Sequence, residues 1–98
     1  MRNGLTWDEI CAATGASVRR GGVAGDTVLP ITTDTRKVAA GDLFVALRGE
    51  NFDGTAFAAE ALERGAAAVL VDQKTPASVL AALDAAHGGV LVAEDTLR

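Results

Sequence analysis

A run of five residues, Thr32-Thr33-Asp34-Thr35-Arg36, carries three hydroxyls, one carboxylate and one guanidinium. It follows a segment expected to be a strand, and ligands of open α/β sheets collect where strands end. Thr hydroxyls can donate to phosphate oxygens, and a guanidinium adds a two-pronged charged contact. In an extended chain Asp34 and Arg36 share one face. The run predicts an anion site, with one alternative left open: Asp34 and Arg36 only pair with each other, and the threonines cap a turn.

A second polar segment, Arg48 to Thr55, follows another expected strand and leads into an expected helix. Helix starts favour anions, Asn51 can pair with the edge of a heterocycle, and Phe52 can pack against its face. The alternative is a plain loop in which Asp53 caps the helix and Phe52 joins the core. The candidate ligand-binding residues of both segments are Thr33, Asp34, Thr35, Arg36, Arg48, Asn51, Phe52, Asp53 and Gly54.

The sequence has no recognisable motif for ATP binding, metal binding or catalysis. It contains no GxxxxGK[ST] loop for ATP phosphates and no GxGxxG. No Cys/His cluster has metal-ligand spacing, so no metal site and no catalytic residue is predicted. The single His, His87, is expected in the last turn of a helix, and the single Cys, Cys11, is expected to be a small core residue.

Length and charge set the class of protein. The chain has 98 residues, which fits one domain, and 49% of them are apolar. The net charge of −4 and the lack of a broad basic cluster argue against nucleic acid as a partner. The sequence has no apolar run long enough to span a membrane and no signal-peptide pattern, so we expect a cytoplasmic location.

Three helices must frame the candidate segments. Thr6 and Glu9 form a capping-box pattern flanked by Leu5 and Ile10, and Gly15 is placed to end that helix in a left-handed turn. A second helix is expected from 53–55 to 64, with Phe57 on its apolar face. A third is expected to have Thr75 as its cap and Pro76 at its first position.

Short apolar runs between these helices predict strands, and runs that are apolar on both faces suit the centre of a covered sheet. Two of them flank the third helix and predict a β-α-β crossover. The expected fold is therefore α/β, with a small mixed sheet of about five strands and three helices. The expected strands are 17–20, 28–33, 43–47, 68–71 and 90–92.

The run from Ile31 to Asp72 contains the ordered pattern [ST]DTR…GDLFVAL.G…FDG…F…A…GA.A.LV. This pattern resembles the N-terminal domain of the Mur ligases, which build the peptidoglycan stem peptide. The opening LTWDEICAATG is similar to the first helix of that family. Two departures stand out: Ala40 replaces a usual Pro, which should loosen the turn modestly, and Thr55 replaces a frequent His but remains a competent cap.

The resemblance implies a ligase of three domains, which bind the UDP part of the substrate, ATP, and the incoming amino acid or dipeptide. Residues 1–98 would be the first domain, inactive alone, with ATP and Mg²⁺ bound in the missing domains. The partner would be a UDP-N-acetylmuramoyl-peptide. The resemblance places Thr33 to Arg36 beside the diphosphate and Arg48 to Gly54 near the uracil and ribose.

Within the family, GENFDG and the opening helix look most like the ligase that adds D-alanyl-D-alanine to the tripeptide substrate. The sister enzyme that adds the third stem residue is the runner-up. Two further classes stay open, a free-standing binding module and an interaction domain without a small ligand. A gene that continues into a phosphate-binding loop after Arg98 would favour the ligase.

Overall fold

The computed structural model describes residues 4–21, 23, 25–46, 54–86 and 88–93. Helical and extended segments alternate along most of the chain. In order they are β1 (Gly4–Thr6), α1 (Trp7–Thr14), β2 (Ser17–Arg20), β3 (Val28–Thr32), η1 (Thr35–Lys37), β4 (Leu43–Val45), η2 (Gly54–Phe57), α2 (Ala58–Glu63), β5 (Ala68–Asp72), α3 (Ala77–Ala85) and β6 (Gly89–Ala93), where η denotes a 3₁₀ helix.

The strands form one sheet in the order β1-β3-β4-β5-β6-β2. The four central strands β3 to β6 are parallel, and β1 and β2 pair antiparallel at the two edges. The predicted β-α-β crossover is confirmed, because β5 and β6 are parallel neighbours joined through α3. The carboxyl ends of β3 and β4 therefore lie at the same end of the sheet, where the first polar segment begins.

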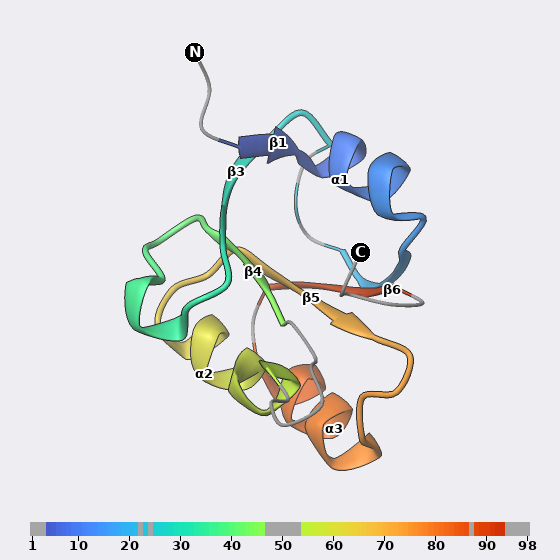
Figure 1. Cartoon of the computed structure of the whole chain (residues 1–98), viewed down its shortest axis with the longest axis vertical. Coiled ribbons are helices and arrows are strands. Elements are labelled where there is room, and N and C mark those ends of the chain that lie inside the picture. The colour runs from blue at the N-terminus through green and yellow to red at the C-terminus, as the bar shows by residue number, and fades with distance from the viewer. Residues whose placement is uncertain (1–3, 22, 24, 47–53, 87, 94–98) are drawn as a thin grey trace.

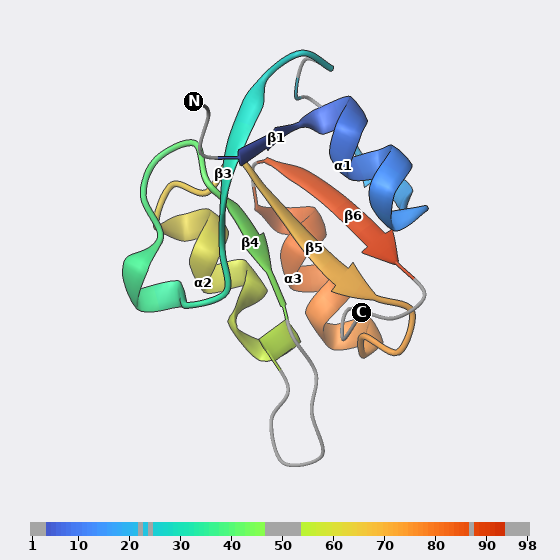
Figure 2. The ribbon, with the colours of Figure 1, turned by 45° about the horizontal axis from the view of Figure 1, so that its top comes forward.

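Helices cover both faces of the sheet, with α2 and α3 on one side and α1 on the other (Figures 1 and 2). Successive strand residues alternate between the two sides, which produces two separate cores. In β5, Val69 and Val71 pack with Leu62 and Leu83 of the helices α2 and α3. On the opposite face, Ala68 and Leu70 join the core that includes Trp7 and Ile10 of α1.

The first helix forms as predicted. The Thr6 hydroxyl accepts from the Glu9 backbone N–H at 3.1 Å, and the Glu9 carboxylate accepts from the Thr6 N–H at 2.9 Å. Gly15 ends the helix with φ of 64°, the left-handed region that glycine adopts without a Cβ clash. The Gly15 N–H donates to the carbonyl of Cys11 at 3.0 Å, and Cys11 is partly buried against the α1 core.

The structure confirms the expected fold class and differs from the expected elements in three details. The sheet has six strands, since the short edge strand β1 lies directly before the α1 cap and carries no alternating pattern of its own. The second helix opens as the 3₁₀ turn η2, and Phe57 is 42% exposed and not in the core. The Thr75 hydroxyl does not cap α3, because it donates to the carbonyl of Asp72 at 2.6 Å.

The strand expected over 43–47 is shorter, because β4 ends at Val45. The expected position of His87 lies outside the described residues. Within the described ranges, no helix is long and apolar enough to cross a membrane.

Candidate functional site

The first wall of the site is the short connection that follows β3. The Thr32 hydroxyl accepts from the Asp34 N–H at 3.2 Å and closes a tight turn at the strand end. The Asp34 carboxylate then accepts from the Arg36 N–H at 2.9 Å and caps η1. The chain between Asp34 and Arg36 therefore turns, whereas an extended chain was expected, because a side-chain cap next to a free N–H favours a helical start.

Asp34 and Arg36 also pair through their side chains. The Arg36 Nε donates to the Asp34 carboxylate at 3.2 Å, and a terminal guanidinium nitrogen donates to its other oxygen at 3.1 Å. These side-chain bonds, followed by the bond from the Arg36 N–H, hold the pKa of Asp34 below its ordinary value, and the pair raises the pKa of Arg36. The Arg36 side chain is 86% exposed, so its guanidinium stays in reach of solvent.

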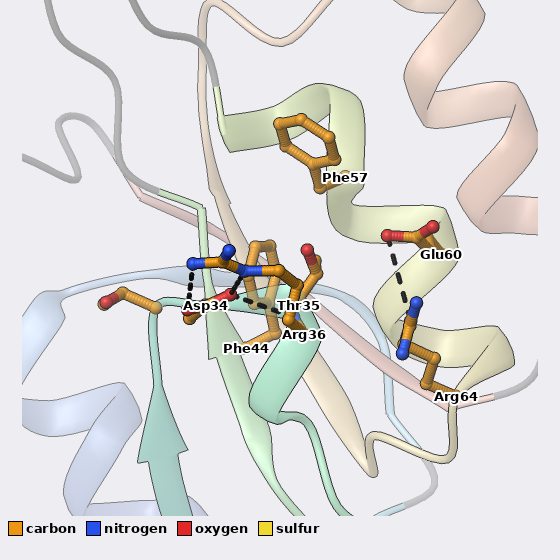
Figure 3. Close-up of a pocket in the computed structure, with 8 residues that line it drawn as sticks. Asp34, Thr35, Arg36, Phe44, Phe57, Glu60 and Arg64 are labelled. Atoms are coloured by element: carbon orange, nitrogen blue, oxygen red, sulfur yellow. Dashed lines mark hydrogen bonds and ion pairs between the residues drawn. The ribbon is translucent and has the colours of Figure 1, made fainter.

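The second wall is the outward face of η2 and α2. Phe57, Glu60 and Arg64 lie there, and the Glu60 carboxylate faces the Arg64 guanidinium at 3.8 Å. Figure 3 shows this pair across from η1, with Phe57 above it. The inward face of the same helix packs into the core through Ala58, Ala61 and Leu62.

The two walls enclose a hollow of about 510 Å³. Its apolar lining includes Phe44 of β4, whose side chain is only 2% exposed and thus forms a fixed floor. The described residues that line it are Thr33, Asp34, Thr35, Arg36, Phe44, Phe57, Glu60 and Arg64. Small-molecule sites have volumes of roughly 300–1,000 Å³, so this hollow has the size of a ligand site.

The walls are fastened to each other at the far end of η1. Asp42 is buried, and its carboxylate accepts from the Ala39 N–H at 2.9 Å. The Asp42 carbonyl accepts from the Ala67 N–H at 2.8 Å, and the Gly41 N–H donates to the Gly65 carbonyl at 3.1 Å. These bonds tie the connection after η1 to the connection after α2, so the spacing of the walls is built into the fold.

Four of the candidate ligand-binding residues, Thr33, Asp34, Thr35 and Arg36, line the hollow, and their role in ligand binding stays a prediction. Arg48, Asn51, Phe52 and Asp53 lie outside the described residues. Gly54 is buried at the start of η2 and is not among the described residues that line the hollow.

Sequence reasoning missed the other four lining residues, namely Phe44, Phe57, Glu60 and Arg64. Phe44 and Phe57 had been assigned to the core on their apolar pattern. One signal could have found the second wall: Glu60 and Arg64 are four apart, the spacing of an ion pair on the exposed face of a helix.

The lining of the hollow combines charged, hydroxyl and aromatic groups that can bind a ligand. It offers two guanidiniums, two carboxylates, two threonine hydroxyls and two aromatic rings around one hollow. The described part of the chain has no group of three or more His, Cys, Asp and Glu that could hold a metal ion. Guanidiniums and hydroxyls recognise phosphates, and aromatic rings pack against flat heterocycles.

Known proteins provide an independent comparison. A family model described as "Mur ligase family, catalytic domain" matches residues 28–93. The chain is 43% identical, over 99 residues, to a UDP-N-acetylmuramoyl-tripeptide–D-alanyl-D-alanine ligase of Treponema pallidum, covering 96% of this chain and 21% of that relative. It is 55% identical, over 47 residues, to a UDP-N-acetylmuramoyl-L-alanyl-D-glutamate–2,6-diaminopimelate ligase of Rhizobium meliloti, covering 48% of this chain and 10% of that relative.

Among solved structures, the fold is similar to MurF from Acinetobacter baumannii, with a TM-score of 0.73 and 29% sequence identity. That match covers 95% of this chain and 18% of the other. The chain thus spans about a fifth or less of the length of these relatives.

Proposed function

Because the chain belongs to the Mur ligase family, we propose that it is the substrate-recognition domain of a ligase that builds peptidoglycan precursors and holds a UDP-N-acetylmuramoyl-peptide. The family membership confirms the prediction from the [ST]DTR and GDLFVAL patterns. The observation that carries the proposal is the hollow between η1 and α2, in which four predicted ligand residues meet two aromatic rings.

The proposed division of labour follows from what the residues can do. Thr33, Thr35 and Arg36 offer donors for a diphosphate, and the segment 48–54 remains the candidate for the nucleoside. ATP and Mg²⁺ would supply the acyl-phosphate chemistry from other domains of a longer chain. The 98-residue chain lacks a phosphate-binding loop, so its role in the reaction is to bind and orient the substrate.

We further propose that the full ligase adds D-alanyl-D-alanine to UDP-N-acetylmuramoyl-tripeptide. The relative matched over nearly the whole chain is named for that reaction, and another similar solved structure from Acinetobacter baumannii is described as a UDP-N-acetylmuramoylalanyl-D-glutamyl-2,6-diaminopimelate–D-alanyl-D-alanyl ligase. The second candidate is the ligase that adds the third stem residue, since a relative with that activity in its name is 55% identical over 47 residues. Either enzyme would act in the cytoplasm and serve cell-wall synthesis, cell shape and division.

Binding to the chain alone tests the first proposal. In equilibrium dialysis with labelled UDP-N-acetylmuramoyl-tripeptide, we expect saturable binding that UDP displaces and ATP does not. Affinity should be weak, because one domain supplies only part of the contact surface of the longer ligase. The entropy that the ligand loses on binding is nevertheless similar in both cases. Absence of binding at millimolar ligand, or equal displacement by ATP, would refute a UDP-substrate site.

The choice between the two ligases needs the longer protein. We expect ATP-dependent ADP release with UDP-N-acetylmuramoyl-tripeptide plus D-alanyl-D-alanine, and much less with the dipeptide substrate plus diaminopimelate or lysine. The reverse preference would assign the protein to the second candidate.

A further inference from the structure

The outward face of η2 and α2 combines an exposed aromatic ring with an arginine. Phe57, Glu60 and Arg64 are three and four residues apart, which aligns side chains on one side of a helix. All three line the hollow, opposite the η1 residues. The resemblance that singled out Thr33 to Arg36 assigned no role to this face.

The two arginines of the hollow are held differently. Arg36 gives two side-chain hydrogen bonds to Asp34, with N–O distances of 3.1 and 3.2 Å. The Arg64 Nε stands 3.8 Å from the Glu60 carboxylate, which is beyond hydrogen-bond distance. Figure 3 shows the Arg36 guanidinium lying over Asp34, whereas Arg64 reaches along α2 beside Glu60.

This difference determines which guanidinium is more available to bind a phosphate. A phosphate that binds Arg36 has to share its N–H donors with the Asp34 carboxylate or break the Arg36–Asp34 pair. Among the described residues Arg64 has this loose ion pair and no hydrogen bond through its guanidinium, and it is always charged. Both side chains of the Glu60–Arg64 pair are 47% exposed, so an ion pair in this position contributes little that would oppose rearrangement.

We propose that Arg64 is a phosphate-contacting residue of the site, and that Glu60 opposes anion binding by partly neutralising it. A phosphate between α2 and η1 then accepts from Arg64, while the exposed ring of Phe57 offers an apolar face to the adjoining part of the ligand. This inference rests on the proposed function, because the ligand class is a nucleoside diphosphate. It adds a second set of ligand contacts on the outward face of η2 and α2, and a carboxylate, Glu60, that weakens anion binding. Neither belongs to the Thr33–Arg36 run.

Two probes, UDP and uridine, separate the phosphate contact from the ring contact. We expect Arg64→Gln to raise the dissociation constant for UDP by at least about tenfold and to leave that for uridine unchanged, as loss of a charge-assisted bond requires. Arg64→Lys should recover part of the lost UDP affinity, because lysine keeps the positive charge but lacks the planar guanidinium that can give two parallel hydrogen bonds. Arg36→Gln should reduce UDP affinity less than Arg64→Gln does.

Glu60→Gln should tighten UDP binding severalfold, because it removes the negative charge beside Arg64. A purely structural role of Glu60 would not produce such an increase in affinity. Glu63→Gln is the matched control, because it makes the same charge change three residues further along α2, where Glu63 lines a different hollow between α2 and α3. UDP affinity of Glu63→Gln should equal that of the unaltered chain.

The outcomes keep the two proposals apart. If the unaltered chain does not bind UDP, the proposed function fails. If it binds UDP and Arg64→Gln binds equally well, or if Glu60→Gln and Glu63→Gln behave alike, only the role of Arg64 and Glu60 is overturned. Circular dichroism of each variant checks that the fold is retained.

Discussion

The Arg36 guanidinium rests on the Asp34 carboxylate through two hydrogen bonds, and this contact limits what either residue can offer a ligand. The structure has features of both interpretations of this run. Asp34 and Arg36 pair with each other at a turn, as in the structural alternative, and both also line the hollow, as a ligand site would require. A ligand role for Arg36 and a structural role are therefore compatible, because its side chain is 86% exposed and only part of its fork is engaged.

Titration of Asp34 tests the pair directly. Its pKa is lowered by the side-chain bonds from Arg36, so the stabilisation is present above the ordinary carboxyl pKa and is lost as pH falls through the lowered value. We expect carbon-detected NMR to give Asp34 a pKa below its ordinary value, and Arg36→Ala to return it upward. An Asp34 pKa that is the same in both proteins would contradict the pairing.

The lining residues found from sequence lie in one recognisable polar run, whereas those missed are two phenylalanines assigned to the apolar core and an ion pair on the exposed face of a helix. Phe57 was assigned inward on helical periodicity, but it ends the 3₁₀ turn η2. A 3₁₀ turn has fewer residues per turn than an α-helix, so it shifts the facing of side chains before α2 begins. Periodicity alone could not predict that shift.

At the scale of elements, the turn Ala39–Asp42 sets the distance between the two walls. The Asp42 N–H donates to the Ala39 carbonyl at 3.1 Å, and Gly41 has φ of 89°, as its place in the sequence predicted. This is the geometry of a type II turn, with Ala40 at the position where Pro is common.

Ala40→Pro should therefore stabilise the chain by about 0.4–1 kcal/mol, because it restricts the unfolded state at a position whose native conformation suits Pro. Urea unfolding followed by circular dichroism measures the change. A lower midpoint in Ala40→Pro would mean that the turn does not have the geometry described.

Element types were largely predictable, and their ends were not. The first helix was predictable residue by residue, because its capping box and its left-handed glycine are local signals. The start of the third helix was not, because the Thr75 hydroxyl has a second partner, the Asp72 carbonyl, that the capping rule does not consider. Competition between local hydrogen bonds can be judged only with the backbone in place.

Across the whole molecule, α1 seals the second face of the sheet by close contact between Trp7 and β6. A Cβ on Gly89 would stand 2.8 Å from the Trp7 ring, so this contact requires glycine. Trp7 is buried with Ile10, and the sheet below them supplies most of the apolar surface of that core.

Gly89→Ala should destabilise the chain by about 1–3 kcal/mol, because the added methyl overpacks the core between α1 and the sheet. Gly21→Ala is the matched control, since the nearest heavy atom to its Cβ would be 4.0 Å away. Thermal unfolding should separate the two variants by several degrees. Equal melting temperatures would contradict the packing of Trp7 on β6.

The order of the strands was beyond the sequence, although the fold class was not. Apolar runs and a crossover helix predicted a covered sheet, but β1 and β2 join it at opposite edges, next to β3 and β6. Those pairings link segments far apart in the chain and leave no local pattern. The same long-range arrangement places α2 opposite η1 and creates the second wall of the site.

An amide NMR titration of the 98-residue chain with UDP-N-acetylmuramoyl-tripeptide locates the substrate site residue by residue. We expect progressive shifts at Thr33–Arg36 and along Phe57–Arg64, with α1 unaffected. Shifts confined to α1 and β2, or no shift at millimolar ligand, would contradict a substrate site between η1 and α2.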